Sequence, residues 1–194
     1  MKAVTFSYDD GVTQDIRLVE ILNRYNLKAT FNLNSELLGK DGSLDILGKR
    51  ILHNKVQPHK ITEIYKGHEI AAHTLTHPDM TDMPADEVIR QVEQDRLNLS
   101  ELSGTEVIGM AYPGRQPNYN SRIARIIENG TGVKYARTTI CNKDFSYQSD
   151  LYEFHPSVFH RDWDQLYKLA EKFVELDPKS EKIFYIWGHS YEFD

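Results

Sequence analysis

Three short segments of this 194-residue chain carry side chains that bind metal ions or transfer protons. Their candidate residues are the adjacent carboxylates Asp9 and Asp10, the histidines His73 and His77 four positions apart, and His189. Carboxylate oxygens and imidazole nitrogens are the ligands of hydrolytic zinc-type sites. If the three segments meet in the folded chain, they form the centre of a metal-dependent hydrolase.

Each segment is ambiguous when it is taken alone. Acidic residues also occur in turns before helices, and a histidine after a strand is often a buried residue bonded to the backbone. Asp9 and Asp10 point in different directions, however, so one carboxylate can bind a metal while the other transfers a proton. His73 and His77 would share one face of a helical turn and bind the same ion. The joint occurrence of the three segments favours a functional site.

The elements that must position these residues alternate along the chain. Apolar runs predict strands, and a helical period predicts helices between them. The strands are expected over 2–8, 28–34, 68–72, 107–111, 133–138 and 182–187, and the helices over 13–25, 61–66, 85–102, 121–129 and 162–176. This alternation predicts an α/β fold with a parallel sheet.

The candidate residues follow the carboxyl ends of predicted strands. Asp9 and His73 stand directly after such a strand and His189 follows the last one by two positions, and functional residues of α/β folds gather at these ends. A closed or nearly closed barrel would therefore bring them to one mouth. Thr13 is expected to cap the first helix, whereas residues 39–57 are assigned to no element.

Length and composition predict a soluble protein with a single domain over residues 1–194. The net charge of −6 provides no basic patch, so no nucleic-acid partner is expected. The single cysteine, Cys141, excludes an intrachain disulfide. No apolar stretch approaches the about 20 residues of a membrane helix, and no signal peptide follows Met1. We therefore expect no membrane partner and a cytoplasmic location, or an extracellular one if a leader was removed; nothing indicates a protein partner.

The segments together are similar to the motifs of a known family. Residues 5–11 read Thr-Phe-Ser-Tyr-Asp-Asp-Gly, which resembles a Thr-Phe-Asp-Asp-Gly motif. Residues 73–77 match His-(Ser/Thr)-x-x-His, residues 187–189 match an apolar residue, any residue and His, and residues 111–114 loosely match a third motif. These are the motifs of the polysaccharide deacetylases, the NodB-homology enzymes of carbohydrate esterase family 4. The resemblance extends over nearly the whole chain.

The resemblance implies a fold and a reaction. The fold is a distorted (β/α)7-type barrel, and the reaction is the metal-dependent removal of N-acetyl or O-acetyl groups from an acetylated amino sugar or polysaccharide. Carried over, Asp10, His73 and His77 bind the metal, most often Zn²⁺, with Co²⁺, Ni²⁺ or Mn²⁺ as alternatives. Asp9 becomes the general base and His189 the general acid that protonates the leaving amine.

The third motif departs from the family pattern. Many members begin it with an arginine that orients the catalytic aspartate, but Ala111 stands there. Arg115 and Arg137 are the candidates to replace that arginine, and we favour Arg137 because it ends another predicted strand. The backbone N–H of Tyr112 is implied to help hold the oxyanion.

The fourth motif, an aspartate near a tryptophan that orients the acid histidine, has no clear match. Residues 162–164 have its composition, but acidic residues are expected there because a helix begins. His155, His160 and Glu192 are further candidates around the site. Aromatic residues that could stack on a sugar ring are Tyr8, Tyr112, Tyr119, Trp163 and Trp187.

Two other functions stay open at this stage. One is a metal-dependent hydrolase of a small-molecule, non-sugar amide on the same fold. The other is a carbohydrate-binding relative without turnover, although such a protein would usually have lost at least one of the candidate residues.

Overall fold

A curled, parallel β-sheet forms the centre of the computed structural model, which describes residues 1–114 and 116–194. Within those residues the sheet has seven strands in the order β7-β6-β5-β2-β1-β9-β8. They are β1 (Lys2–Asp9), β2 (Ala29–Leu33), β5 (Glu69–Ala72), β6 (Gly109–Ala111), β7 (Tyr135–Arg137), β8 (Val158–Phe159) and β9 (Lys182–Gly188). Every pairing between them is parallel. The expected distorted barrel is confirmed, in the form of a half-barrel.

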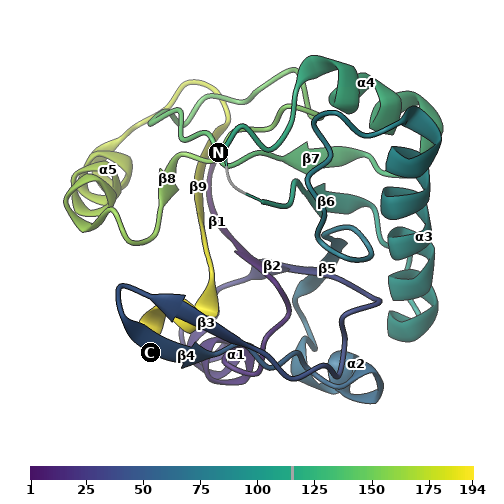
Figure 1. The fold of residues 1–194 in the computed structure, drawn as a ribbon. Helices are drawn as coiled ribbons and strands as arrows, with labels where there is room; N and C mark the ends of the chain where they lie inside the picture. Colours follow the sequence, from purple (N-terminus) through teal and green to yellow (C-terminus); the bar gives the residue numbers. More distant parts are fainter. Residues whose placement is uncertain (115) are drawn as a thin grey trace.

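Helices surround the curled sheet on its outside (Figure 1). They are α1 (Asp15–Arg24), α2 (Ile61–Ile64), α3 (Ala85–Ser103), α4 (Ser121–Gly130) and α5 (Trp163–Glu175), with the short 3₁₀ turns η1 (Pro58–Lys60) and η2 (Ser190–Phe193). Most lie between parallel strands, as parallel connections require. The main core is packed between the sheet and α1, α3 and α4, and a second cluster lies under α5.

The gap between the last strands of the half-barrel is spanned by an irregular segment. Residues 151–157 pair with β7 through an isolated parallel bridge between Arg137 and Phe154. On the other side, the N–H of Ser157 donates to the carbonyl of Tyr185 on β9 at 2.7 Å. The segment therefore runs from the edge strand β7 to β9, where it continues into the other edge strand, β8.

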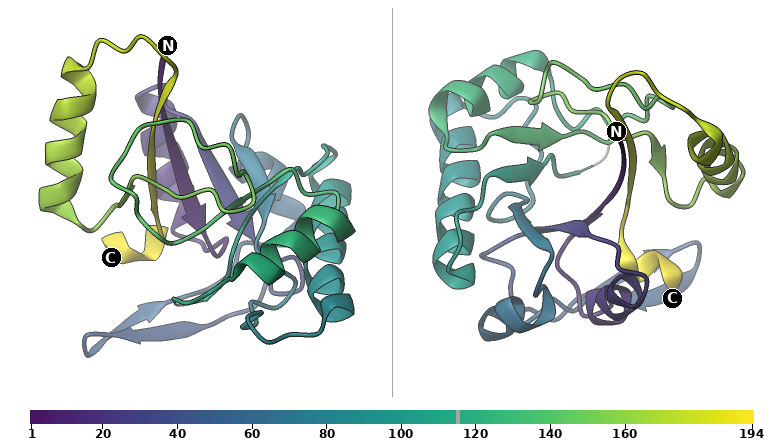
Figure 2. Two further views of the ribbon diagram at one scale, coloured as in Figure 1. Left: turned by 90° about the horizontal axis from the view of Figure 1, so that it is seen from above. Right: turned by 180° about the vertical axis from the view of Figure 1, so that it is seen from behind.

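The unassigned region 39–57 contains an antiparallel hairpin of β3 (Ser43–Ile46) and β4 (Lys49–Leu52). Leu47 and Gly48, both with positive φ (52° and 79°), form its two-residue turn, as type I′ hairpins require. The hairpin projects from the body of the protein (Figure 2), and most of its side chains are exposed or half-buried. It therefore lacks the apolar run from which a buried strand is recognised.

The expected cap at Thr13 is wrong. Helix α1 begins at Asp15 with Gln14 at its N-cap, and no side chain caps it. The N–H of Thr13 donates instead to the carbonyl of Asn54 at 2.8 Å, next to a bridge between Val12 and Lys55. The chain after β1 thus pairs with the segment that follows the hairpin, and this pairing delays the helix.

Among the described residues, no helix combines the length and the apolar composition needed to cross a membrane.

Candidate active site

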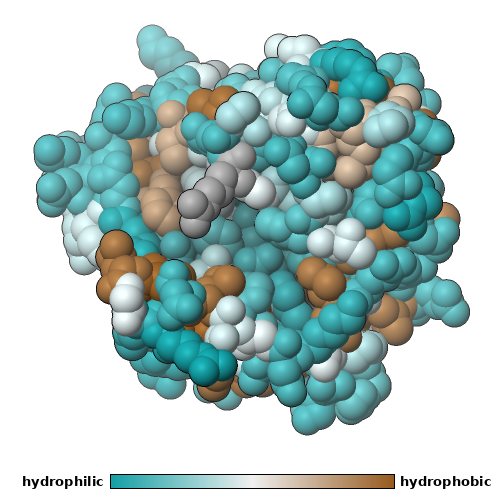
Figure 3. Space-filling view, viewed as in Figure 1, coloured by the Kyte–Doolittle hydropathy of each residue, from teal (hydrophilic) through white to brown (hydrophobic). Residues whose placement is uncertain are grey.

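The three segments converge on one cavity at the carboxyl ends of β1, β5 and β9. The cavity has a volume of about 650 Å³ and lies under the hydrophilic hollow near the centre of the face in Figure 3. Its lining includes Asp9, Asp10, His53, Lys55, His73, His77, Tyr112, Trp187, His189 and Tyr191. The expected convergence at strand ends is therefore present in the fold.

Asp10, His73 and His77 form a group suited to a metal ion, with one ligand atom of each within 4.8 Å of the others. The Nδ1 of His73 donates to the carbonyl of Ala111 at 2.8 Å, since a carbonyl only accepts. This bond leaves Nε2 as the ligand atom and fixes the ring, as second partners of metal-binding histidines do. Burial lowers the pKa of His73 to about 4, so the ring is neutral at physiological pH. One carboxylate and two imidazoles fit a divalent transition metal.

The backbone that presents these ligands is bent, not helical. Asp10 and Gly11 have φ of 84° and 60°, and a Cβ at Gly11 would lie 2.7 Å from Cδ2 of Leu33. A side chain at Gly11 would therefore be strained and would press on Leu33. Thr74 and His77 also have positive φ (68° and 60°), so the expectation that the two histidines share a helical turn is wrong. A loop brings the rings together, with centroids 4.9 Å apart.

Asp9 lies beside the metal-type group and has its own partners. Asn32 Nδ2 donates to Asp9 Oδ1 at 2.8 Å, and Arg137 Nη2 lies 2.5 Å from both carboxylate oxygens. Burial would raise the pKa of Asp9, but the charge of Arg137, the charge of His189 and the hydrogen bonds from Arg137 hold that pKa below its ordinary value. Asp9 is therefore an ionised carboxylate.

Arg137 contacts Asp9, as expected of the arginine that replaces the one missing from the third motif. It ends β7, is fully buried, and its guanidinium lies 4.8 Å from the ring centre of Trp187. The predicted contact between Arg137 and Asp9 is thus present. Arg115, the alternative, falls outside the described residues.

We expect Arg137→Met to destabilise the fold by about 3–5 kcal/mol, because it leaves a buried carboxylate without its cation. We also expect kcat to fall about 10²-fold as Asp9 loses its orientation. Urea unfolding and initial rates measure the two effects. The exposed Arg24→Met is the matched control. Arg137→Lys, which keeps the charge but not the planar fork, should recover stability better than rate. Full activity in Arg137→Met would exclude the orienting role.

His189 faces Asp9 across the cavity, with Nε2 4.0 Å from Asp9 Oδ2. Its Nδ1 lies 3.1 Å from Glu192 Oε2. Burial would lower the pKa of His189, but the hydrogen bond that its ring donates to Glu192 and the charges of Asp9 and Asp10 raise that pKa above its ordinary value. The ring is therefore suited to carrying a proton near neutral pH.

Tyr112 does not have the expected free N–H. That N–H donates to the carbonyl of Arg137 at 3.0 Å, which continues the ladder between β6 and β7. The hydroxyl of Tyr112 donates to the carbonyl of Tyr152. Tyr112 lines the cavity, but its assignment as an oxyanion donor is corrected.

Other candidates lie apart from the cavity. His155 bonds to Thr138 at 2.7 Å, and neither it nor Tyr8, Tyr119 or Trp163 belongs to the lining. Tyr8 is buried against Phe31, and Trp163 is half-exposed on α5. Of the proposed sugar-stacking aromatics, Tyr112 and Trp187 line the cavity, and Tyr191, not foreseen, joins them.

Besides Tyr191, four residues with hydrogen bonds to the candidate residues were not predicted from the sequence. His53 Nε2 lies 3.2 Å from Asp10 Oδ2, and Lys55 Nζ donates to the carbonyl of Asp10 at 2.6 Å. Asn32 holds Asp9, and Asp95 accepts from the N–H of His73 at 2.9 Å. Asp95 had a visible signal, because it stands among the apolar positions of α3. His53 and Lys55 had none, because their segment had no assigned element.

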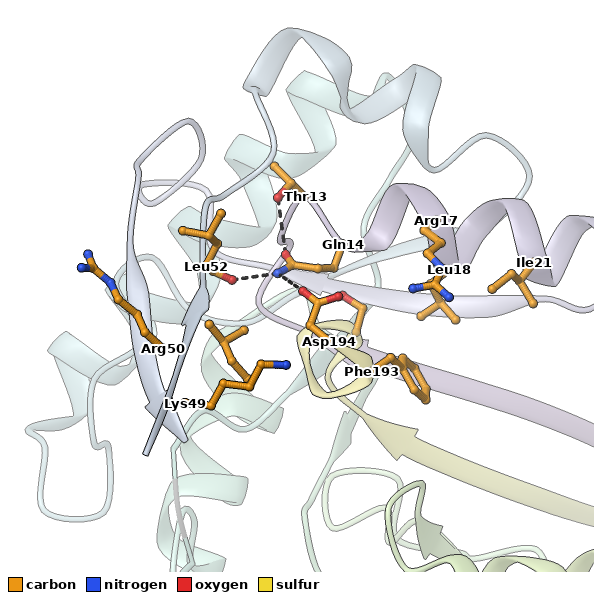
Figure 4. Close-up of a pocket in the computed structure, with 12 residues that line it drawn as sticks. Thr13, Gln14, Arg17, Leu18, Ile21, Lys49, Arg50, Leu52, Phe193 and Asp194 are labelled. Carbon is orange, nitrogen blue, oxygen red and sulfur yellow. Dashed lines mark hydrogen bonds between the residues drawn. The ribbon is translucent and has the colours of Figure 1, made fainter. Parts of the chain in front are cut away.

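A second pocket, of about 770 Å³, lies outside the barrel between α1, β4 and η2. Figure 4 shows Gln14 there, donating to the carbonyl of Leu52 and to the carboxylate of Asp194. This pocket shares no lining residue with the strand-end cavity and contains no histidine. The candidate chemistry therefore belongs to the strand-end cavity.

Known proteins with similar sequences are deacetylases. The chain is 26% identical over 107 residues to a bifunctional xylanase/deacetylase of Pseudobutyrivibrio xylanivorans, covering 55% of this chain and 15% of that protein. It is 21% identical over 150 residues to the peptidoglycan-N-acetylglucosamine deacetylase PgdA of Listeria monocytogenes, covering 76% of this chain and 28% of that protein. The chain thus spans less than a third of the length of either relative.

The fold is also similar to a solved structure, the Streptococcus pyogenes deacetylase PplD in complex with acetate. The TM-score is 0.61 at 22% sequence identity, with 77% of this chain and 61% of that chain covered. The sequence model of the family described as Polysaccharide deacetylase matches residues 1–136. With the motifs at the strand ends and the half-barrel that carries them, this match shows that the chain belongs to the polysaccharide deacetylase family, the NodB-homology group of carbohydrate esterase family 4.

Proposed function

We propose that this protein is a metal-dependent hydrolase that removes N-acetyl groups from an acetylated amino sugar. The observation that carries the proposal is that the carboxylate of Asp9 and the imidazole of His189 lie next to the three candidate metal ligands. Asp9 Oδ2 and His189 Nε2 are 4.0 Å apart there, and Asp10, His73 and His77 stand beside them. Loss of turnover usually removes at least one member of such a set, so its completeness favours an enzyme over a binding protein.

Asp10, His73 and His77 would hold the divalent cation, with Zn²⁺ as the proposed ion. When bound, such a cation polarises an acyl oxygen and makes water more acidic. Asp9 stands outside this ligand group; its Oδ1 accepts from both Asn32 and Arg137, whereas its Oδ2 accepts from Arg137 alone and can still take up a proton. The division leaves Asp9 free for proton transfer.

Asp9 and His189 accept and donate the protons that amide hydrolysis requires. Asp9 accepts a proton from the attacking water, whose oxygen forms a bond to the acetyl carbon. The C–N bond breaks, and His189 delivers its proton to the departing nitrogen. The products are acetate and a free amine. His189 can supply this proton near neutral pH because its pKa is raised.

The cavity supports a sugar as the group that carries the acetamide. The partly exposed Trp187 lines it, together with the buried rings of Tyr112 and Tyr191, and the Trp187 ring can pack against the apolar face of a sugar ring. The curated relatives are a peptidoglycan-N-acetylglucosamine deacetylase and a xylanase/deacetylase. These features favour an N-acetylated hexosamine over a non-sugar amide.

We expect the Zn²⁺-supplemented protein to release acetate from short oligomers of N-acetylglucosamine. A non-sugar acetamide should be hydrolysed with a kcat/KM lower by about tenfold for each ~1.4 kcal/mol of lost sugar contact. Acetylated xylan tests whether the site accepts O-acetyl esters. Faster hydrolysis of the non-sugar acetamide would contradict the sugar assignment. No acetate from any of the three would contradict the proposed activity.

A further inference from the structure

Glu192, three residues after His189, is the acceptor for an unusual set of donors. Its Oε2 lies 3.0 Å from the backbone nitrogen of His189, 3.1 Å from the Nδ1 of the same residue and 2.7 Å from the Nε2 of His160. Arg161 Nη1 is 3.8 Å from the other carboxylate oxygen. One largely buried carboxylate therefore joins two imidazoles that come from different parts of the chain.

The polar contact of the His160 side chain is the hydrogen bond to Glu192. His160 follows β8, is 2% exposed, and lies among the rings of Tyr8, Phe159 and Phe193. Among the described residues, Glu192 is the only hydrogen-bond partner of its side chain, and its buried Nδ1 has none. The aromatic rings therefore hold His160 in place while its Nε2 bonds to Glu192.

Gly188 makes room for this support. A Cβ at Gly188 would lie 2.4, 2.5 and 2.6 Å from the Cδ2, Cγ and Nε2 atoms of His160. Any side chain there would displace the His160 ring and with it the partner of Glu192. The middle residue of the segment at 187–189 is therefore constrained by the packing of His160.

The bond to Glu192 decides which nitrogen of His189 can give up a proton. An ionised carboxylate only accepts, so the Nδ1 of His189 carries a hydrogen in both charge states of the ring. The exchangeable proton then sits on Nε2, the atom that faces Asp9 and the cavity. Without the bond to Glu192, the His189 ring would have neither a fixed Nδ1–H tautomer nor a fixed orientation toward Asp9.

We propose that Glu192, supported by His160, is the positioning residue that aims His189 as the general acid, an inference that rests on the proposed deacetylation. In the family that this chain resembles, an aspartate near a tryptophan orients the acid histidine, and Glu192 would do so here. Asp162 and Asp164 were the compositional match, but they lie at the start of α5, and no hydrogen bond among the described residues joins them to His189.

The charges around the pair support this role. Burial would raise the pKa of Glu192, but bonds from His160 and His189 lower it to about 2, so the group is ionised. The groups facing His189 are Asp9 and Asp10 at the end of β1 and Glu192 itself, all of which raise its pKa; Arg161 faces Glu192 from the other side. A histidine with a raised pKa keeps its proton below that pKa and loses it as pH rises through it.

The test compares Glu192→Gln with the wild type by two measurements. Titration of the ring nitrogens of His189 by NMR, identified with His189→Ala, should show a lower pKa and a loss of the fixed Nδ1–H tautomer in Glu192→Gln. The rate on an N-acetylglucosamine oligomer should fall about 10–10²-fold in kcat with little change in KM, and the alkaline limb of the pH–rate profile should move to lower pH.

A leaving group that needs no proton separates positioning from general damage. On 4-nitrophenyl acetate, Glu192→Gln should lose much less rate than on the amide. Glu192→Asp should recover part of the amide rate, and the exposed Glu175→Gln should match the wild type. An unchanged His189 titration in Glu192→Gln, or equal losses on amide and ester, would overturn the inference. Absence of hydrolysis in the wild type would sink the proposed function alone, because the NMR titration still decides the role of Glu192.

Discussion

Replacing Asp9 with asparagine is expected to lower kcat for acetate release by about 10²–10⁴-fold, the usual loss when a general base is removed. Metal affinity should stay near that of the wild type, because Asp9 is bound by Arg137 and Asn32 and stands outside the Asp10, His73 and His77 group. Initial rates on an N-acetylglucosamine oligomer and calorimetric titration with Zn²⁺ measure the two quantities.

The substitution keeps the shape of the side chain but leaves the buried Arg137 without an anion, so folding must be checked by circular dichroism. The exposed Asp41→Asn is the control for a loss of one negative charge. Asp10→Asn, in contrast to Asp9→Asn, should weaken metal binding strongly, because Asp10 belongs to the ligand group. If Asp9→Asn loses metal together with activity, Asp9 belongs to the ligand group and the division of roles is wrong.

The order of elements and the meeting of the three segments could be predicted because both depend on local pattern. Buried parallel strands are apolar runs, and helices such as α3 and α4 have clear periods and end signals, including Gly104 after α3. Once the strands are known, their carboxyl ends must lie on one side of the sheet. The positions of Asp9, His73 and His189 followed from this geometry.

Features that depend on contacts between distant segments were not visible. The hairpin of β3 and β4 has exposed faces and no apolar run, so His53 and Lys55 could not be placed beside Asp10. The N–H of Tyr112 was assigned to the substrate, but the β6–β7 ladder uses it. A hydrogen bond of this kind is decided by strand register, which no local pattern reports.

The role of Arg137 could be predicted from the sequence more fully than that of Glu192. The contact of Arg137 with Asp9 could be anticipated, because a predicted strand ends at Arg137 and Ala111 leaves a role unfilled. Glu192 was only one of several candidates, since its function depends on the path of η2 and on His160, which packs against Gly188 from a distant loop.

The second large effect that we expect is a complete dependence of hydrolysis on one metal ion per chain. Asp10, His73 and His77 supply two imidazoles and one carboxylate as donors, and the charge stabilisation that a bound metal ion gives to the transition state is worth several kcal/mol. Removing the ion should therefore lower acetate release below detection. His77→Ala, which deletes one ligand, should need a large excess of Zn²⁺ for any activity, whereas His59→Ala, an exposed histidine outside the cavity, should behave like the wild type.

The most direct measurement is acetate release from an N-acetylglucosamine oligomer by chelated protein as Zn²⁺ is added back in fractions of an equivalent. We expect no release from the chelated protein, a linear rise in rate with added Zn²⁺, and a break at one equivalent. A chelated protein that hydrolyses the substrate as fast as the reloaded one would contradict the assignment of Asp10, His73 and His77 as the centre of a metal-dependent deacetylase.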